Sequence, residues 1–262
     1  MATTLHPLNF LSELFRRNTL LAWFGSLSLL TFFVLLILSF SEERTFAGIN
    51  IWIKPMKFLI SLWIFAWTMA WLLWHLPQKR KIGTISWGIV FIFFVEMAII
   101  IRQAARGVGS HYNVSTFQDM ILFQIMGIAI VLNTLLVFWA FMLYAKVDNL
   151  PKGYHLAIRL GMLIFILASF EGFFMTSNLG HTVGAKDGVE GIFFLNWAKA
   201  YGDLRVAHFL GLHALQVLPL VGWFFFRHKT LPVWIFGSLY FLFSFAMLWN
   251  ALAGRAFYDW GI

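Results

Sequence analysis

The chain has 262 residues, of which 61% are hydrophobic, 19% aromatic and only 11% charged. Soluble domains carry roughly 25% charged residues, so this composition excludes a soluble globular domain and favours a membrane protein. In a membrane protein, the formal net charge of +8 is best explained by basic residues that fix the orientation of the chain. It does not indicate a surface that binds nucleic acid. The absence of cysteine excludes disulfides, thiolate nucleophiles, cysteine-ligated iron–sulfur clusters and covalently attached c-type haem.

An apolar run of about 20 residues crosses a bilayer as a helix, and seven runs of the chain meet this criterion. They are Thr19–Phe40, Ala47–Trp74, Gly83–Arg102, Phe117–Tyr144, Tyr154–Ser177, Leu204–Phe226 and Leu231–Ala253. We therefore predict an all-α, polytopic integral membrane bundle of about seven transmembrane helices, forming one domain over residues 1–262. Within residues 1–18, Leu8, Leu11 and Phe15 recur at helical spacing before Arg16-Arg17, which predicts a short interfacial helix.

Charged residues are unevenly distributed between the segments that connect these runs. If the N-terminus is cytoplasmic, the inner segments hold ten basic residues against two acidic ones, whereas the outer half holds nine of each sign. Because cytoplasmic loops are enriched in Lys and Arg, this distribution predicts an N-terminus inside and a C-terminus outside. We call the second side the predicted outer side. Its longest segment, residues 178–203, is rich in glycine and aromatic residues, and we expect it to fold back over the helix ends.

Most polar residues inside the apolar runs lie near the predicted outer side. Lys54 and Lys57 share one face of the second run, where snorkelling to lipid headgroups is the simplest explanation for them. In the third run, Glu96 lies about 10 Å below the helix end, at a depth where a carboxylate needs a cation or a proton. Glu171 in the fifth run is a second carboxyl group at similar depth. The two carboxyl groups indicate either ion pairs between helices or a functional site.

The sixth run contains the densest group of polar residues. Arg205, His208, His213 and Gln216 form one stripe that descends from the predicted outer surface. The two histidines are five residues apart, so their rings diverge, whereas a zinc-binding pair on one helix is usually four apart. Each histidine is therefore either a hydrogen-bonded packing residue or a ligand with a partner of its own. Gly211 between them permits the close approach of a neighbouring helix or a flat ligand.

Two further histidines, His111 and His181, lie in glycine-rich outer segments that can bend their rings toward the bundle. The other four, His6, His75, His155 and His228, lie at the predicted inner boundary and resemble ordinary interface residues.

Some polar residues near the helix ends have a simpler structural explanation. Thr116-x-x-Asp119 is typical of a capping box before the fourth run, and Asp203 is suited to capping the sixth. At the C-terminus, Tyr258, Asp259 and Trp260 form an aromatic segment suited to anchoring the chain at the membrane interface.

These residues support three functional hypotheses. The first is a b-type haem or a transition-metal centre of a membrane oxidoreductase, ligated by one or more of His208, His213, His111 and His181. In this hypothesis Glu96, Glu171 and Arg205 are the candidate catalytic residues, and Lys54, Lys57 and Gln216 complete the cofactor site. A zinc hydrolase built from the same residues, with Glu96 or Glu171 as the base, is a variant of it.

The second hypothesis is a transporter or proton-conducting protein, in which the buried carboxyl groups and His213 carry protons or gate a substrate. The third is a non-catalytic subunit or sensor of a membrane complex. Expected partners are membrane lipid and either a quinone or another membrane subunit, with no nucleic acid, and the expected location is the bacterial inner membrane. The sequence disfavours a retinal-binding photoreceptor, because the seventh run contains no lysine to form a Schiff base.

Overall fold

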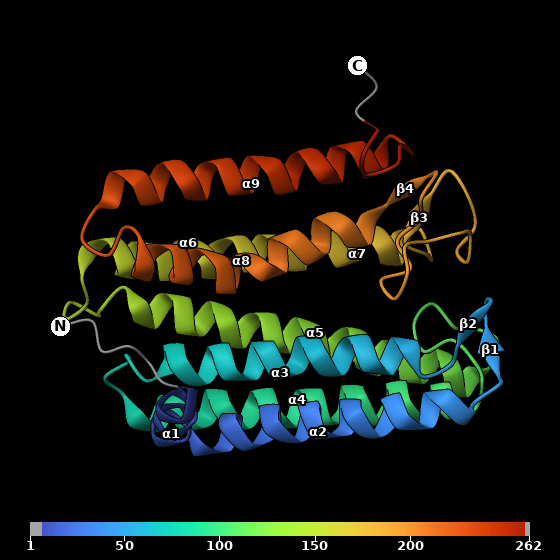
Figure 1. The fold of residues 1–262 in the computed structure, drawn as a ribbon, viewed down its shortest axis with the longest axis horizontal. Coiled ribbons are helices and arrows are strands. Elements are labelled where there is room, and N and C mark those ends of the chain that lie inside the picture. Colours follow the sequence, from blue (N-terminus) through green and yellow to red (C-terminus); the bar gives the residue numbers. More distant parts are fainter. Residues whose placement is uncertain (1–6, 260–262) are drawn as a thin grey trace. The chain divides into compact units, whose positions relative to one another are not determined.

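The computed structural model describes residues 7–259 and contains helices almost throughout (Figure 1). His6 and Trp260, which the sequence places at the membrane boundaries, lie outside the described residues, as does the side chain of Leu8.

The long helices are α2 (Thr19–Ser41), α3 (Ile53–Leu73), α4 (Lys79–Ala105), α5 (Phe117–Tyr144), α6 (Lys152–Ser169), α8 (Leu204–Phe224) and α9 (Thr230–Leu252). Shorter helices are α1 (Pro7–Arg17) and α7 (Glu171–Ser177). Among residues 7–259, seven helical segments are long and apolar enough to cross a membrane, with α6 and α7 together forming one of them. The prediction of an all-α, multi-pass membrane bundle is confirmed.

The chain divides into two compact units, Met1–Leu136 and Val137–Ile262. The first unit contains α1 to α4 and most of α5, and the second contains the end of α5 with α6 to α9. Each unit is described by itself below, and the organisation into a single domain stays a prediction.

In the first unit, the amphipathic helix α1 is attached to the inner end of α3. The guanidinium of Arg17 stacks 3.7 Å from the ring of Trp71, and Glu13 accepts hydrogen bonds from both Arg16 and Arg17. Leu14 in the same helix is fully buried. Asn18 then caps α2, because its side chain accepts from the backbone N–H of Leu21. The predicted short helix is thus confirmed, and polar and aromatic contacts dock it on the bundle.

Two predicted runs differ from the structure, the second at its start and the fifth in its interior. The second run begins as a helix only at Ile53, because β1 (Thr45–Phe46) and β2 (Ile49–Asn50) form a hairpin before it. Ala47 and Gly48 both adopt positive φ, of 50° and 76°, which is the geometry of a two-residue hairpin turn. The fifth run is interrupted at Phe170, so that α6 ends and α7 begins there. Apolar composition identifies a span but not a local break within it.

In the second unit, small residues let α6 and α8 pack closely. A Cβ atom added at Gly211 would overlap the side chain of Ala168, and one added at Gly222 would overlap that of Ala157. Lipid tails are as apolar as leucine side chains, so the hydrophobic effect does not drive membrane helices together. Small residues favour helix association because they allow the two backbones to pack closely. Gly211 therefore serves the approach of a neighbouring helix, which is one of the two roles expected for it.

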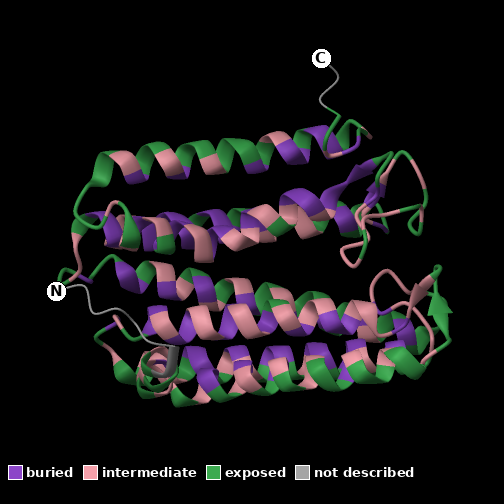
Figure 2. Cartoon of the chain, in the orientation of Figure 1, coloured by how far each residue is buried: buried purple, intermediate pink, exposed green. Residues whose placement is uncertain are grey.

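Burial within the units follows this packing (Figure 2). Half of the spanning part of α3, of α4 and of α6 with α7 is buried, compared with 28% in α2, α5 and α9. Large apolar side chains such as Phe40, Trp87 and Trp249 are exposed on their units. In a soluble protein this surface would cause aggregation, but in a bilayer it is the expected contact with acyl chains. The structure accordingly describes an integral multi-pass membrane protein.

The long segment after α7 folds back over the end of its unit, as expected. Its strands β3 (Thr182–Val183) and β4 (Gly202–Asp203) pair antiparallel, and Gly202 lies against the carbonyl of Ala251 at the end of α9. This pairing returns the chain to the first residue of α8.

Candidate functional site

The candidate residues belong to two different units. Lys54, Lys57, Glu96 and His111 lie in the first unit. Glu171, His181, Arg205, His208, His213 and Gln216 lie in the second. The single shared pocket expected from the sequence stays a prediction, whereas the geometry inside each unit is defined.

In the first unit, Glu96 is buried in the spanning part of α4. Its side chain is only 1% exposed, and neither carboxyl oxygen has a hydrogen-bond partner among the described residues. Nε2 of His111 lies 3.7 Å from one of these oxygens, and Lys54 on α3 is the cation whose charge acts on the carboxyl group. Lys54 is thus the cation expected near Glu96, and neither oxygen has a direct hydrogen bond from residues 7–259.

The end of α4 explains how His111 reaches Glu96. The N–H of Gly107 donates to the carbonyl of Ala104, and that of Val108 donates to Gln103, which together form a Schellman motif. Gly107 adopts the left-handed conformation that this motif requires, with φ of 69°. The motif ends the helix and reverses the chain. Nδ1 of His111 then lies 3.1 Å from the hydroxyl of the buried Ser110.

A polar network next to this site joins α4 to α5. Asp119 accepts hydrogen bonds from Gln103 at 2.8 Å, from Arg106 at 2.6 Å and from the hydroxyl of Thr116 at 2.8 Å. The Thr116 hydroxyl accepts in turn from the N–H of Asp119, which confirms the predicted cap. Arg106 and Asp119 therefore pair with each other, whereas His111 lies 3.7 Å from Glu96 and the charge of Lys54 acts on Glu96.

In the second unit, Glu171 and His208 both lie at the break between α6 and α7. Glu171 is the first residue of α7, and its Oε2 is buried without a hydrogen-bond partner among residues 7–259. Nδ1 of His208 lies 2.9 Å from the carbonyl of Ala168, three residues before Glu171. A carbonyl only accepts, so Nδ1 carries the hydrogen, and the imidazole binds a backbone group near the end of α6. His208 is therefore a packing contact between α6 and α8.

His213 differs from His208 in where its ring points. Its Nδ1 donates to the carbonyl of Phe209 in the same helix at 2.8 Å, and its ring lies 3.9 Å from that of Phe209. His213 lies near the middle of α8 and is only partly buried in its unit. Because Nδ1 carries the hydrogen, Nε2 is an unprotonated acceptor. No described residue bonds to it.

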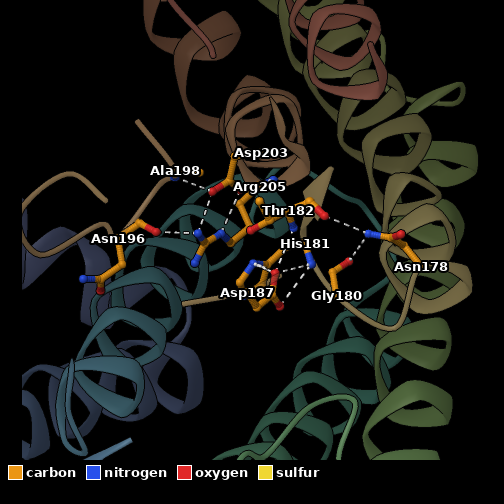
Figure 3. A network of polar contacts seen from close by, with 9 residues as sticks. All are labelled: Asn178, Gly180, His181, Thr182, Asp187, Asn196, Ala198, Asp203 and Arg205. Carbon is orange, nitrogen blue, oxygen red and sulfur yellow. Dashed lines mark hydrogen bonds and ion pairs between the residues drawn. The ribbon is translucent and has the colours of Figure 1, made fainter. Parts of the chain in front are cut away.

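The predicted cap at Asp203 is confirmed, and Arg205 is tied to the same carboxylate (Figure 3). Asp203 accepts from the N–H of Arg205 and forms two hydrogen bonds with its guanidinium, at 2.6 and 2.9 Å. The other Asp203 contact is with the N–H of Ala198, and Arg205 also donates to the carbonyl of Asn196. This ion pair holds the long loop on the start of α8, and the catalytic role predicted for Arg205 stays a prediction.

His181 belongs to the same loop network (Figure 3). Its Nδ1 lies 2.9 Å from Asp187, whose carboxylate also accepts from the backbone N–H groups of His181 and Thr182. Burial lowers the pKa of His181. Burial alone would raise the pKa of Asp187, but hydrogen bonds from His181 and Thr182 hold it well below the usual range. His181 thus organises the loop, and Asp187, sixteen residues before the cap of α8, is the partner that sequence spacing did not indicate.

Among residues 7–259, no three His, Asp or Glu side chains come together in a way that would hold a metal ion. A haem differs from such a site in needing only one or two axial side chains. Comparison of the chain with protein-family models, with curated proteins and with solved structures finds no match.

The residues that sequence reasoning missed are mainly backbone groups. The carbonyls of Ala168 and Phe209 hold the two imidazoles of α8, and no side-chain pattern marks them. The hydroxyl of Ser110 was also missed, although it immediately precedes His111.

Proposed function

We propose that this chain is a haem-binding membrane oxidoreductase or redox subunit in which His213 is an axial ligand. The observation that carries the proposal is the hydrogen bond from Nδ1 of His213 to the carbonyl of Phe209, which leaves Nε2 as an unpartnered base near the middle of a span. Histidines that ligate metals and haem iron usually donate their other ring N–H to a carbonyl or carboxylate, which orients the ring and fixes its tautomer.

The membrane setting strengthens this proposal. A polar group at hydrocarbon depth costs free energy unless something satisfies it, and an ionisable residue there usually marks a functional site. Within the described residues nothing satisfies Nε2 of His213. A haem iron would satisfy it, and Gln216, one turn further along α8, lies beside the same position.

His208 is the weaker candidate for the ligand. Its ring already connects α8 to Ala168 in α6, so a ligand on it would have to fit within the closest helix contact of the unit. We therefore assign the axial position to His213 and a packing role to His208. A quinone or a second redox subunit in the bacterial inner membrane would supply or remove the electron.

The test is the visible spectrum of the full chain, purified in detergent from cells supplemented with haem precursor. We expect a Soret band and reduced α and β bands of a b-type haem, and their loss in His213→Ala. The matched control is His155→Ala, because the His155 ring bonds to the carbonyl of Tyr144 at the other end of its unit and should not affect haem content. A monodisperse wild-type protein without visible absorbance would overturn the proposal.

A further inference from the structure

The first unit contains a second, independent arrangement of titratable groups around Glu96. We propose that Glu96 and His111 form a proton-binding site, in which the Glu96 carboxyl group stores a proton and the His111 imidazole exchanges it with the predicted outer side. This inference rests on the first unit alone and does not depend on a haem in the second.

The first argument is the state of the carboxyl group. Both oxygens of Glu96 are buried and neither accepts a hydrogen bond from any described residue. Structural carboxylates in membranes are paired or hydrogen-bonded, because an ion without such contacts pays its full desolvation energy. Asp119, in the same unit, shows the paired arrangement with three side-chain donors. Glu96 accepts no hydrogen bond within the described part of the chain, and the His111 imidazole approaches it only to 3.7 Å, so we take the neutral acid as its resting form.

The second argument is the position of His111 between Glu96 and the surface. The His111 side chain is 22% exposed, whereas that of Glu96 is 1% exposed, and the two approach to 3.7 Å. The ring is enclosed by Phe58 at 5.6 Å and Phe123 at 6.4 Å. The imidazole is thus a titratable group that lies close to the buried acid and also reaches the surface of the unit.

The third argument is the charge of the surroundings. Of the elements around α4, α2 contains no titratable residue, and Asp119 on α5 is bound by Arg106, Gln103 and Thr116. Near the outer end of α4, Arg102 contacts Gln103 and Arg44 donates to the carbonyl of Ala105. The other groups are His111 and, on α3, Lys54 and Lys57, of which Lys54 acts on Glu96. The positive charge of Lys54 stabilises the carboxylate when the proton leaves, which favours exchange between the two protonation states.

The proposed step is a simple proton transfer. The carboxyl O–H bond of Glu96 breaks as an N–H bond forms at Nε2 of neutral His111, which gives a carboxylate and an imidazolium. The hydroxyl of Ser110 accepts the N–H at Nδ1, and the imidazolium then releases one proton to water on the outer side. The 3.7 Å separation closes by a small movement of the ring or through one water molecule.

The site opens to one side only. Between Glu96 and the inner end of α4, the titratable residues are Lys79, Arg80 and Lys81 in the first turn, and α3 has none between Lys57 and its last residue. A relay through the membrane needs successive titratable groups, so this arrangement binds and releases a proton and does not conduct it across the membrane.

The experiment is infrared difference spectroscopy of the purified full chain during a pH titration and after transfer to heavy water. We expect a carboxylic acid C=O band that is lost in Glu96→Gln, is shifted in Glu96→Asp and persists in Glu171→Gln. In His111→Phe the band should remain while its hydrogen–deuterium exchange becomes slower by about tenfold or more. The matched control is His228→Phe, because His228 is exposed between α8 and α9 in the second unit and should leave this rate unchanged.

Two outcomes would overturn the inference. A wild-type spectrum without a band sensitive to Glu96→Gln at any pH would show that Glu96 is a permanent carboxylate in a structural ion pair. An unchanged exchange rate in His111→Phe would show that the proton takes another route. Glu96→Asp retains a carboxylic acid, so the shift of its C=O band tests the inference if Glu96→Gln does not fold. Loss of haem from the chain would change neither outcome.

Discussion

At the scale of single residues, partners determine what each polar group does. Arg205 and His111 are both cationic or titratable residues near the predicted outer side, yet their surroundings differ. Arg205 is tied by two hydrogen bonds to Asp203, whereas His111 lies beside an acid that has no hydrogen bond. The first arrangement stabilises a loop and the second is suited to proton exchange.

The buried ion pair of the long loop gives a stability prediction. Asp203 is 1% exposed, so Asp203→Ala leaves the Arg205 guanidinium without its partner and should destabilise the protein by about 3–5 kcal/mol. Unfolding in increasing denaturing detergent measures the loss. The control is Lys199→Ala in the same loop, whose pair with Glu190 is exposed and should contribute about 0–1 kcal/mol. Equal losses in the two variants would contradict a structural role for the Asp203 pair.

His75, at the inner end of α3, gives a prediction for pH dependence. Burial, assisted by the charge of Arg17, lowers its pKa from 6.5 to about 4. The unfolded chain then binds a proton at a higher pH than the folded chain does, so stability is complete above pH 6.5 and falls as pH decreases toward 4. The melting temperature of the wild type should fall over this range relative to that of His75→Gln. An equal decrease of melting temperature with pH in the two proteins would refute this assignment.

At the scale of elements, helix contacts and helix ends position the candidate groups. Three helices end in Schellman motifs at the predicted outer side, with Gly107, Leu179 and Gly254 in the left-handed position. The first of these motifs returns His111 to α4. The contact of α8 with α6, through Gly211, places His208 at the carbonyl of Ala168 and leaves His213 on another side of the helix.

The α6–α8 contact can be tested by adding volume to it. Gly211→Val forces a side chain against Ala168, and overpacking of this kind should destabilise the protein by about 1–3 kcal/mol. The matched control is Gly172→Val in α7, where nothing lies within 4 Å of the added Cβ. Detergent-induced unfolding distinguishes the two variants. If Gly172→Val were as destabilising as Gly211→Val, helix propensity and not packing would explain the loss.

At the scale of the whole molecule, the distribution of charge predicts orientation. The inner segments hold ten basic residues against two acidic ones, which predicts that residues 178–203 and the C-terminus lie outside. The proton-binding site around Glu96 would then face the outer side of the membrane, as would the loop held by Asp203.

The absence of cysteine makes this orientation easy to test. A single cysteine at Lys186, which is exposed in the long loop, should react with a membrane-impermeant maleimide in intact cells. A single cysteine at Asp148, exposed between α5 and α6, should react only after the cells are permeabilised. The reverse pattern of labelling would invert the orientation and place the Glu96 site on the inner side.

The sequence by itself determined the class of the protein and most of its helix boundaries. The α5 helix has the bounds predicted for it, and the caps at Asp119 and Asp203 were also identified in advance. These features are local, because apolar length sets a span and a cap needs groups only one turn apart. The hairpin before α3 and the break at Phe170 escaped prediction, since both depend on backbone conformations that apolar composition does not specify.

Only the tertiary structure decided which polar groups meet. Glu96 and Glu171 look alike in sequence, but His111 and Lys54 lie near the first, whereas the second begins a short helix at a break. His208 and His213 are five residues apart, and their rings bind carbonyls of different helices. The contact of His208 with Ala168 joins residues 40 positions apart. Contacts of this kind depend on how closely helices approach and where each chain segment turns, so they arise from packing and not from any local pattern.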